Sequence, residues 1–167
     1  MNKKIAKIFH VYFFPVAMFL VCLSIIISSY VGGPPAGSTN APGENTCYGS
    51  PACHQGTPNT GPGFGELTIS GGVPPGNYYI PGSIYVMMPY AVDTAKLKGG
   101  FEVVAKLTNG MNAGTSTITM PMNTQLITSG GYQYVEQTAT GAVKPVIANM
   151  HDWMYDWQAP SSGSGTV

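Results

Sequence analysis

The stretch that decides the fold is Phe101–Leu107, FEVVAKL, whose side chains alternate between two faces. The positions of one face are all apolar: Phe101, Val103, Ala105 and Leu107. The opposite face carries two charged residues around a valine: Glu102, Val104 and Lys106. A period of two is typical of a β-strand that buries one face, so this stretch predicts a half-buried strand.

Other short segments with strand character lie on both sides of this stretch. They are Phe64–Ser70, Ser83–Val92, Thr115–Met120, Gln125–Thr128, Tyr132–Thr138 and Met150–Trp157. Turn signals separate them: Gly71-Gly72, Pro74-Pro75-Gly76, Asn109-Gly110 and Gly130-Gly131. Because no long helical period interrupts these segments, residues 64–167 predict an all-β sandwich of six to eight strands.

The last of these segments carries three aromatic residues on one face, Trp153, Tyr155 and Trp157. We expect them in the core of the sandwich, together with Phe101, because large aromatic rings dominate core packing. An exposed stripe could instead stack a sugar ring, which would make the chain a carbohydrate-binding module. On the other face, Asp152 and Asp156 could bind a cation, but neighbouring His151 points the opposite way. We therefore expect a turn and a polar outer face at this trio.

The first 31 residues have the pattern of an export signal. Three lysines precede an almost wholly apolar run, Val11–Ile27, and two serines follow it. We expect cleavage of this leader; the alternative is an uncleaved anchor helix, since the run nearly spans a bilayer. Membrane contact is expected only through an uncleaved leader. The predicted location is secreted or on the cell surface.

The composition after the leader excludes some partners. Residues 32–167 contain four lysines, seven acidic residues and no arginine, a formal charge of −3. Such a chain is a poor binder of nucleic acids and other polyanions.

The segment 32–63 is rich in proline and glycine, with six prolines, and contains Cys47, Cys53 and His54. The prolines oppose helix and sheet pairing, so we expect a loop segment here. After export, Cys47 and Cys53 would form a local disulfide in an oxidising compartment. The alternative is a covalently attached haem with His54 as the iron ligand. Five residues separate the cysteines, however, where the usual haem motif has two.

Ordered motifs across residues 32–167 resemble the reelin-type (Reeler) domain, which is also known as a choice-of-anchor domain of bacterial surface proteins. The motifs are Gly32–Gly37, Ala41–Glu44 before Thr46-Cys47, Tyr79–Gly82, Gly100–Glu102 and the Trp153–Pro160 segment. The resemblance implies an immunoglobulin-like sandwich on an exported protein. It also implies further strands beyond Val167, so we expect a truncated C-terminus with an exposed sheet edge.

The predicted function is therefore a non-enzymatic domain for adhesion or envelope interaction, with no cofactor and an extracellular or envelope partner. The alternative from a different class is a single-haem electron-transfer module that uses Cys47, Cys53 and His54.

Overall fold

The computed structural model describes residues 30–48, 54, 57, 60–72, 74–93, 95–143 and 150–167. The chain divides into two compact units, Met1–Tyr30 and Val31–Val167, and the fold described here is that of the second. The predicted leader and Cys53 lie outside the described residues.

The described part of the second unit is built from short strands with very little helix. The strands are β1 (Phe64–Ile69), β2 (Ile84–Val92), β3 (Glu102–Val104), β4 (Thr115–Thr117), β5 (Thr124–Ser129), β6 (Tyr132–Gln137), β7 (Met150–Asp152) and β8 (Tyr155–Gln158). Two short helical turns accompany them, the 3-10 turn η1 (Pro75–Asn77) and α2 (Ala139–Ala142).

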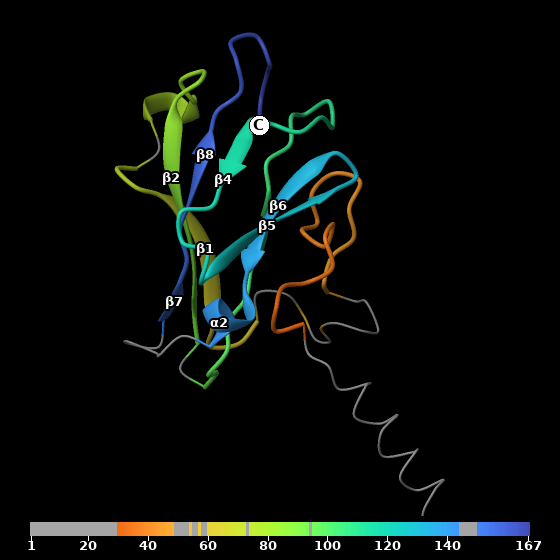
Figure 1. Ribbon diagram of the computed structural model, residues 1–167, viewed down its shortest axis with the longest axis vertical. Coiled ribbons are helices and arrows are strands. Elements are labelled where there is room, and N and C mark those ends of the chain that lie inside the picture. Colours follow the sequence, from red (N-terminus) through yellow and green to blue (C-terminus); the bar gives the residue numbers. More distant parts are fainter. Residues whose placement is uncertain are drawn as a thin grey trace, which may run out of the picture. The chain divides into compact units, whose positions relative to one another are not determined.

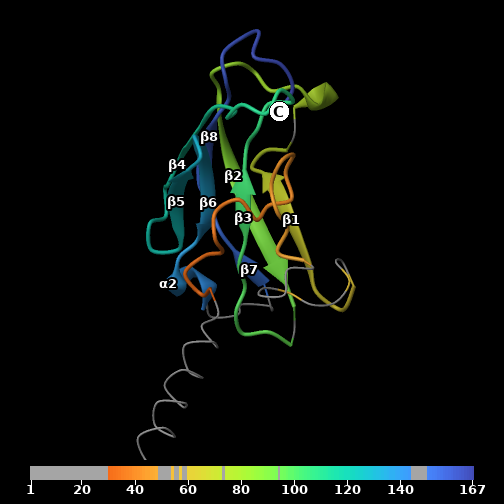
Figure 2. The same ribbon diagram turned by 90° about the vertical axis from the view of Figure 1, so that its right-hand side faces the viewer.

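These strands form two antiparallel sheets. The larger sheet has the order β1-β2-β8-β4, with β7 also paired to β2, and the smaller has the order β3-β6-β5. Figures 1 and 2 show β2 and β8 side by side in the larger sheet, with the smaller sheet as a separate layer. The predicted all-β sandwich is confirmed.

The predicted single strand Met150–Trp157 is two strands, and Pro89 of β2 explains the interruption. β7 and β8 pair with β2 in one continuous register, in which Tyr90 lies opposite Asp152 and Met87 opposite Tyr155. Between these pairs, Trp153 N donates to Pro89 O at 2.9 Å. The return bond is missing because proline has no N–H to donate.

Two other predicted strands are shorter than expected. The stretch Phe101–Leu107 contributes only Glu102–Val104 as β3, and Thr115–Met120 contributes only Thr115–Thr117 as β4. After β3 the chain turns at Asn109-Gly110, where Leu107 N donates to Met111 O at 2.8 Å. This local hairpin satisfies the backbone of Leu107 outside the sheet.

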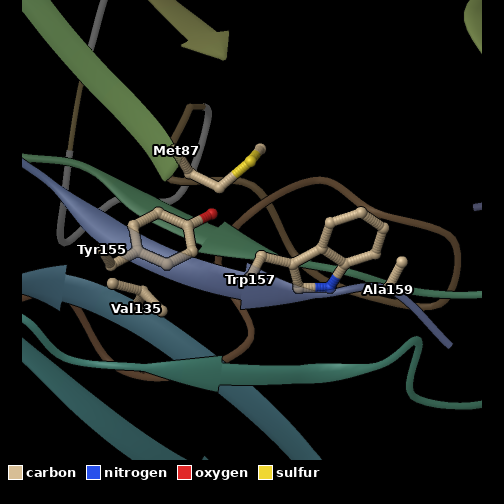
Figure 3. Close-up of a cluster of buried hydrophobic side chains, with 5 residues drawn as sticks. All are labelled: Met87, Val135, Tyr155, Trp157 and Ala159. Atoms are coloured by element: carbon tan, nitrogen blue, oxygen red, sulfur yellow. The ribbon is translucent and has the colours of Figure 1, made fainter. Parts of the chain in front are cut away.

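The core lies between the two sheets. Met87, Tyr155, Trp157 and Ala159 come from β2, β8 and the residue just after β8, and Val135 comes from β6. Figure 3 shows Tyr155 and Trp157 projecting from one strand, with Met87 and Val135 beside the Tyr155 ring. Phe101, Val103 and Leu126 of the smaller sheet and its flank pack against this cluster.

Both tryptophan indoles find hydrogen-bond partners in the core. Trp157 Nε1 donates to Ala113 O at 2.9 Å, and Trp153 Nε1 donates to Gly141 O at 3.2 Å. Gly141 has no room for a side chain, since a Cβ there would lie 2.1 Å from Asn123 O. Trp153 also packs on Phe101, with ring centroids 4.8 Å apart.

We predict that Trp157→Ala lowers the free energy of unfolding by about 3–5 kcal/mol, because it empties the centre of the core. Tyr78→Ala is the matched control, because Tyr78 is 77% exposed, and it should change stability by less than about 0.5 kcal/mol. Chemical denaturation followed by fluorescence or circular dichroism would measure both. Equal losses in the two variants would contradict the observed packing.

Candidate functional site

The segment Val31–Tyr48, here called the strap, lies against the outer face of the smaller sheet. In Figures 1 and 2 the strap (orange) runs beside the sheet formed by β3, β6 and β5. The strap has no helix or regular strand, and one isolated bridge, between Thr39 and Thr46, closes it on itself. Its contacts with the sheet are therefore made largely by side chains of the sheet.

An ion pair fastens the strap near its centre. Lys106 Nζ lies 2.6 Å from Glu44 Oε1, and both side chains are almost completely buried. Tyr134 Oη donates to the same oxygen at 2.7 Å, and Thr39 donates to Oε2. Burial raises the pKa of Glu44, but the bonds from Lys106, Thr39 and Tyr134 outweigh it, so the pKa lies below the usual 4.5.

Two further glutamates of the smaller sheet lie under the first half of the strap. Glu102 accepts hydrogen bonds from the backbone N–H groups of Gly37 and Ser38, each at 2.9 Å. Glu136 is opposite Glu102 in the strand register and is buried below Gly33. Gly33 has a φ of +110°, a backbone conformation that favours glycine, and a Cβ there would lie 2.1 Å from Glu136 Oε2.

Glu136 is poorly satisfied for a buried carboxyl group. Its Oε2 lies 3.5 Å from Gln125 Nε2, and its Oε1 has no hydrogen-bond partner. Burial and the nearby Glu102 raise the pKa of Glu136 from 4.5 to about 7. Burial likewise raises the pKa of Glu102, although the two strap N–H groups oppose this.

No pattern in the sequence pointed directly to this arrangement. Glu102 and Lys106 are on the polar face of FEVVAKL. A polar face of a strand considered alone predicts exposure to solvent. The strap contacts that face, so a polar face in the sequence is a partly buried one in the fold.

The predicted site residues Cys47 and His54 come together at the end of the strap. His54 N donates to Cys47 O at 3.0 Å, and Tyr48 forms a parallel bridge with His54. Cys47 and His54 are thus neighbours in the fold, and His54 is exposed. Cys53 lies outside the described residues, and so does its predicted pairing.

The outer face of the larger sheet carries an apolar row along β2. The residues of the row alternate with the core-facing ones and are Ile84, Val86, Met88, Tyr90 and Val92. Phe64 of β1 lies opposite Val92 and extends the row. Ile84 is 63% exposed and Phe64 57% exposed. We call these six residues the β2 row.

Acidic residues border the β2 row on both sides. Glu66 of β1 and Asp152 of β7 lie opposite Tyr90, and Asp156 of β8 lies opposite Val86. Tyr90 Oη donates to Glu66, and the rings of Tyr90 and Phe64 meet edge to face at 5.9 Å. This pair of rings is perpendicular and does not form one flat platform.

The four predicted core aromatics lie as follows: Trp153, Tyr155 and Trp157 are buried on the inner face, and Phe101 is half-buried against them. The expectation of a turn at the neighbouring trio was wrong for His151. This residue is in β7 and its side chain is buried beside Trp153, because it shares the inward face with the aromatics. Asp152 is exposed and Asp156 is half-exposed.

Two other findings concern the described residues alone. No group of three or more His, Cys, Asp or Glu side chains there could hold a metal ion. Within the same residues, no helix has the length and apolarity to cross a membrane.

The raised pKa of Glu136 predicts a specific pH dependence. The folded state holds a proton on Glu136 that the unfolded chain releases, so this group stabilises the fold below about pH 4.5 and stops doing so as the pH rises through about 7. A rise of the pKa from 4.5 to about 7 corresponds to roughly 3 kcal/mol. Glu136→Gln should therefore be more stable than wild type at pH 8. Its free energy of unfolding should also decrease less than that of wild type between pH 5 and 8.

Denaturant unfolding across this pH range would measure the effect, with Glu66→Gln on exposed β1 as the matched control. Glu44 acts in a separate window: its lowered pKa contributes stability that is lost only as the pH falls below about 4.5. An unchanged pH profile in Glu136→Gln would show that Glu136 is not buried as described.

Comparisons with known proteins give a fold likeness only. No family model matches the chain, and no curated protein matches it. Two similar solved structures are the human F-spondin reeler domain (fragment 1) and the Reelin-N domain of F-spondin. Each is 22% identical with a TM-score of 0.46 and covers 60% of this chain; the coverage of the other chain is 68% and 66%, respectively. At this level of similarity, the fold is assigned from the strand pairing of the chain itself.

Proposed function

We propose that this chain is an exported, non-enzymatic β-sandwich domain that contacts a protein partner at the cell surface or envelope through the β2 row. The observation that carries the proposal is the difference between the two outer faces. The strap contacts the outer face of the smaller sheet, whereas the outer face of the larger sheet presents the partly exposed β2 row. Apolar residues gathered on one face mark an interaction site more often than scattered ones do.

The border of the β2 row defines the chemistry of the partner. Glu66, Asp152 and Asp156 place negative charge on both sides of the apolar residues. A complementary surface has an apolar centre with lysine or arginine at its edge, and such charge complementarity favours association and fixes register. The partner that fits is therefore a basic, apolar-centred protein surface.

For the end of the strap we propose a disulfide between Cys47 and Cys53. The hydrogen bond from His54 N to Cys47 O brings the two ends of this short segment together, as a local cross-link requires. The pattern of the leader supports export to a compartment in which disulfides persist. A covalent haem on Cys47, Cys53 and His54 is the alternative, since two thiols and an imidazole are its donor set.

We predict that the exported protein has an intact mass two protons below that of the reduced chain and shows no Soret band. The measurement is mass spectrometry and a visible spectrum of protein produced in a host with cytochrome c maturation machinery. The variant Cys53→Ser should remove the mass deficit. A haem-sized mass increase with a Soret band would replace the disulfide by the haem alternative.

The binding proposal predicts that Phe64→Asp and Ile84→Asp each weaken attachment of the fluorescently labelled, exported protein to cells of the producing organism by about tenfold or more. Met122→Asp is the matched control, because Met122 is 74% exposed but lies between β4 and β5, outside the β2 row. Since all three residues are largely exposed, the variants should unfold at similar temperatures.

Flow cytometry at several salt concentrations would measure attachment, which should weaken as salt rises. Equal attachment by all three variants would overturn the proposed face. If a soluble polysaccharide competed for attachment and abolished it, the result would instead indicate carbohydrate recognition by Phe64 and Tyr90.

A further inference from the structure

A groove of about 420 Å³ lies at the end of the larger sheet. Its walls come from the start of β1, the end of β2, the loop before β3 and His151 of β7. The loop contributes Lys96 and Lys98, and Asp93 follows directly after β2. The core and the β2 row account for none of these charged residues.

His151 is the unusual member of the groove, because it is only 3% exposed and, in the part of the chain that the structure describes, neither ring nitrogen has a hydrogen-bond partner. Its ring stacks on Trp153 with centroids 6.0 Å apart and an angle of 16°. Gly99 also lies against it, since a Cβ there would lie 2.9 Å from His151 Cγ. The ring is thus packed between neighbours, and its two buried nitrogens are left without a hydrogen-bond partner among the described residues.

Leaving a buried polar group without a hydrogen-bond partner is unfavourable, so such a group needs an explanation. A ligand that accepts a hydrogen bond from the imidazole would satisfy His151, and since both ring nitrogens are buried, the wall of the groove at Gly99 would have to shift to admit it. Because His151 lines the groove, the groove is where that ligand can reach it.

The charged residues around His151 favour an anionic ligand. Lys96 and Lys98 are both exposed and line the groove, whereas Lys106 is paired with Glu44 under the strap. Asp93 is the acid of the groove, and its Oδ1 accepts a hydrogen bond from Ala95 N at 2.8 Å. With two ammonium groups and one carboxylate, the groove has a net positive charge. The chain after the leader has a net negative charge, so the groove differs from the rest of it.

We propose that this groove binds a phosphate group, with Lys96 and Lys98 neutralising its charge and His151 donating a hydrogen bond to it. A free phosphate and the phosphodiester of a lipid headgroup share this chemistry. Leu97, between the two lysines, is 79% exposed and could enter an apolar lipid layer in the second case. The proposal does not depend on the function assigned to the β2 row.

The first experiment titrates inorganic phosphate into the exported protein labelled with ¹⁵N-histidine. The ring nitrogen resonances of His151 should shift in a saturable way, while those of exposed His54 should not. Lys96→Gln/Lys98→Gln should weaken binding about tenfold or more, and because both lysines are exposed the fold should be retained. His151→Gln should also weaken binding, with a melting curve to confirm folding.

A matched pair of variants tests the role of charge at this place. Asp93→Asn removes the acid of the groove and should tighten phosphate binding. Asp156→Asn makes the same charge change beside Val86, six residues along β2 from Val92 and so about 20 Å from the groove, and should leave binding unchanged.

Sedimentation with vesicles distinguishes the two sources of phosphate. Binding to phosphatidylglycerol vesicles but not to phosphatidylcholine vesicles, lost in Leu97→Asn while phosphate binding is kept, would identify the lipid headgroup. Phosphate binding without vesicle binding would identify a free phosphate ligand. Unsaturable shifts, or equal shifts in wild type and Lys96→Gln/Lys98→Gln, together with no vesicle binding, would overturn the proposal.

Discussion

The fold depends on one constraint: the extended segment from β7 through β8 must bury every second residue. His151, Trp153, Tyr155, Trp157 and Ala159 are all buried. This segment pairs with β2 throughout and with β4 at its far end, so its inward face lies at the centre of the sandwich. A slip of one residue would expose both tryptophans and bury Asp152 and Asp156, which makes the register strongly specified.

The register also has a consequence for chemistry. Because the period is two, the constraint that buries the tryptophans also buries His151, whose ring nitrogens have no hydrogen-bond partner among the described residues. The imidazole stacks on Trp153 and also lines the groove that we propose binds phosphate, so the same register serves both the core and that groove.

The smaller sheet solves a different physical problem. Its outer face carries Glu102, Tyr134 and Glu136, which the strap covers. Burying carboxyl groups is unfavourable unless they are bonded or protonated. Glu44 and Glu102 are bonded, by Lys106 and by the strap N–H groups respectively, whereas Glu136 tends toward the protonated form. Attachment of the strap is thus coupled to proton binding at one buried glutamate.

Period-two alternation was sufficient to predict the sandwich, since FEVVAKL and Met150–Trp157 each showed their buried face in the sequence. It could not predict the interruption at Trp153, because the cause is Pro89 on a different strand. Nor could it predict that the strap covers Glu102 and Lys106, because a proline-rich segment has no periodicity that shows its docking position. The groove around His151 was equally hidden, since it joins residues from Thr60 to His151, which are 91 positions apart in the chain.

The two outer faces of the sandwich have different roles: one is covered by the chain itself, and the other is available to a partner. On the smaller sheet, a segment of the same chain supplies the covering contacts, so that face is satisfied without a partner. On the larger sheet, the β2 row offers apolar side chains between acids. The acids keep such a face soluble and disfavour pairing of two copies, since like charges would meet. The same residues then favour a basic partner, so solubility and specificity have a common physical origin.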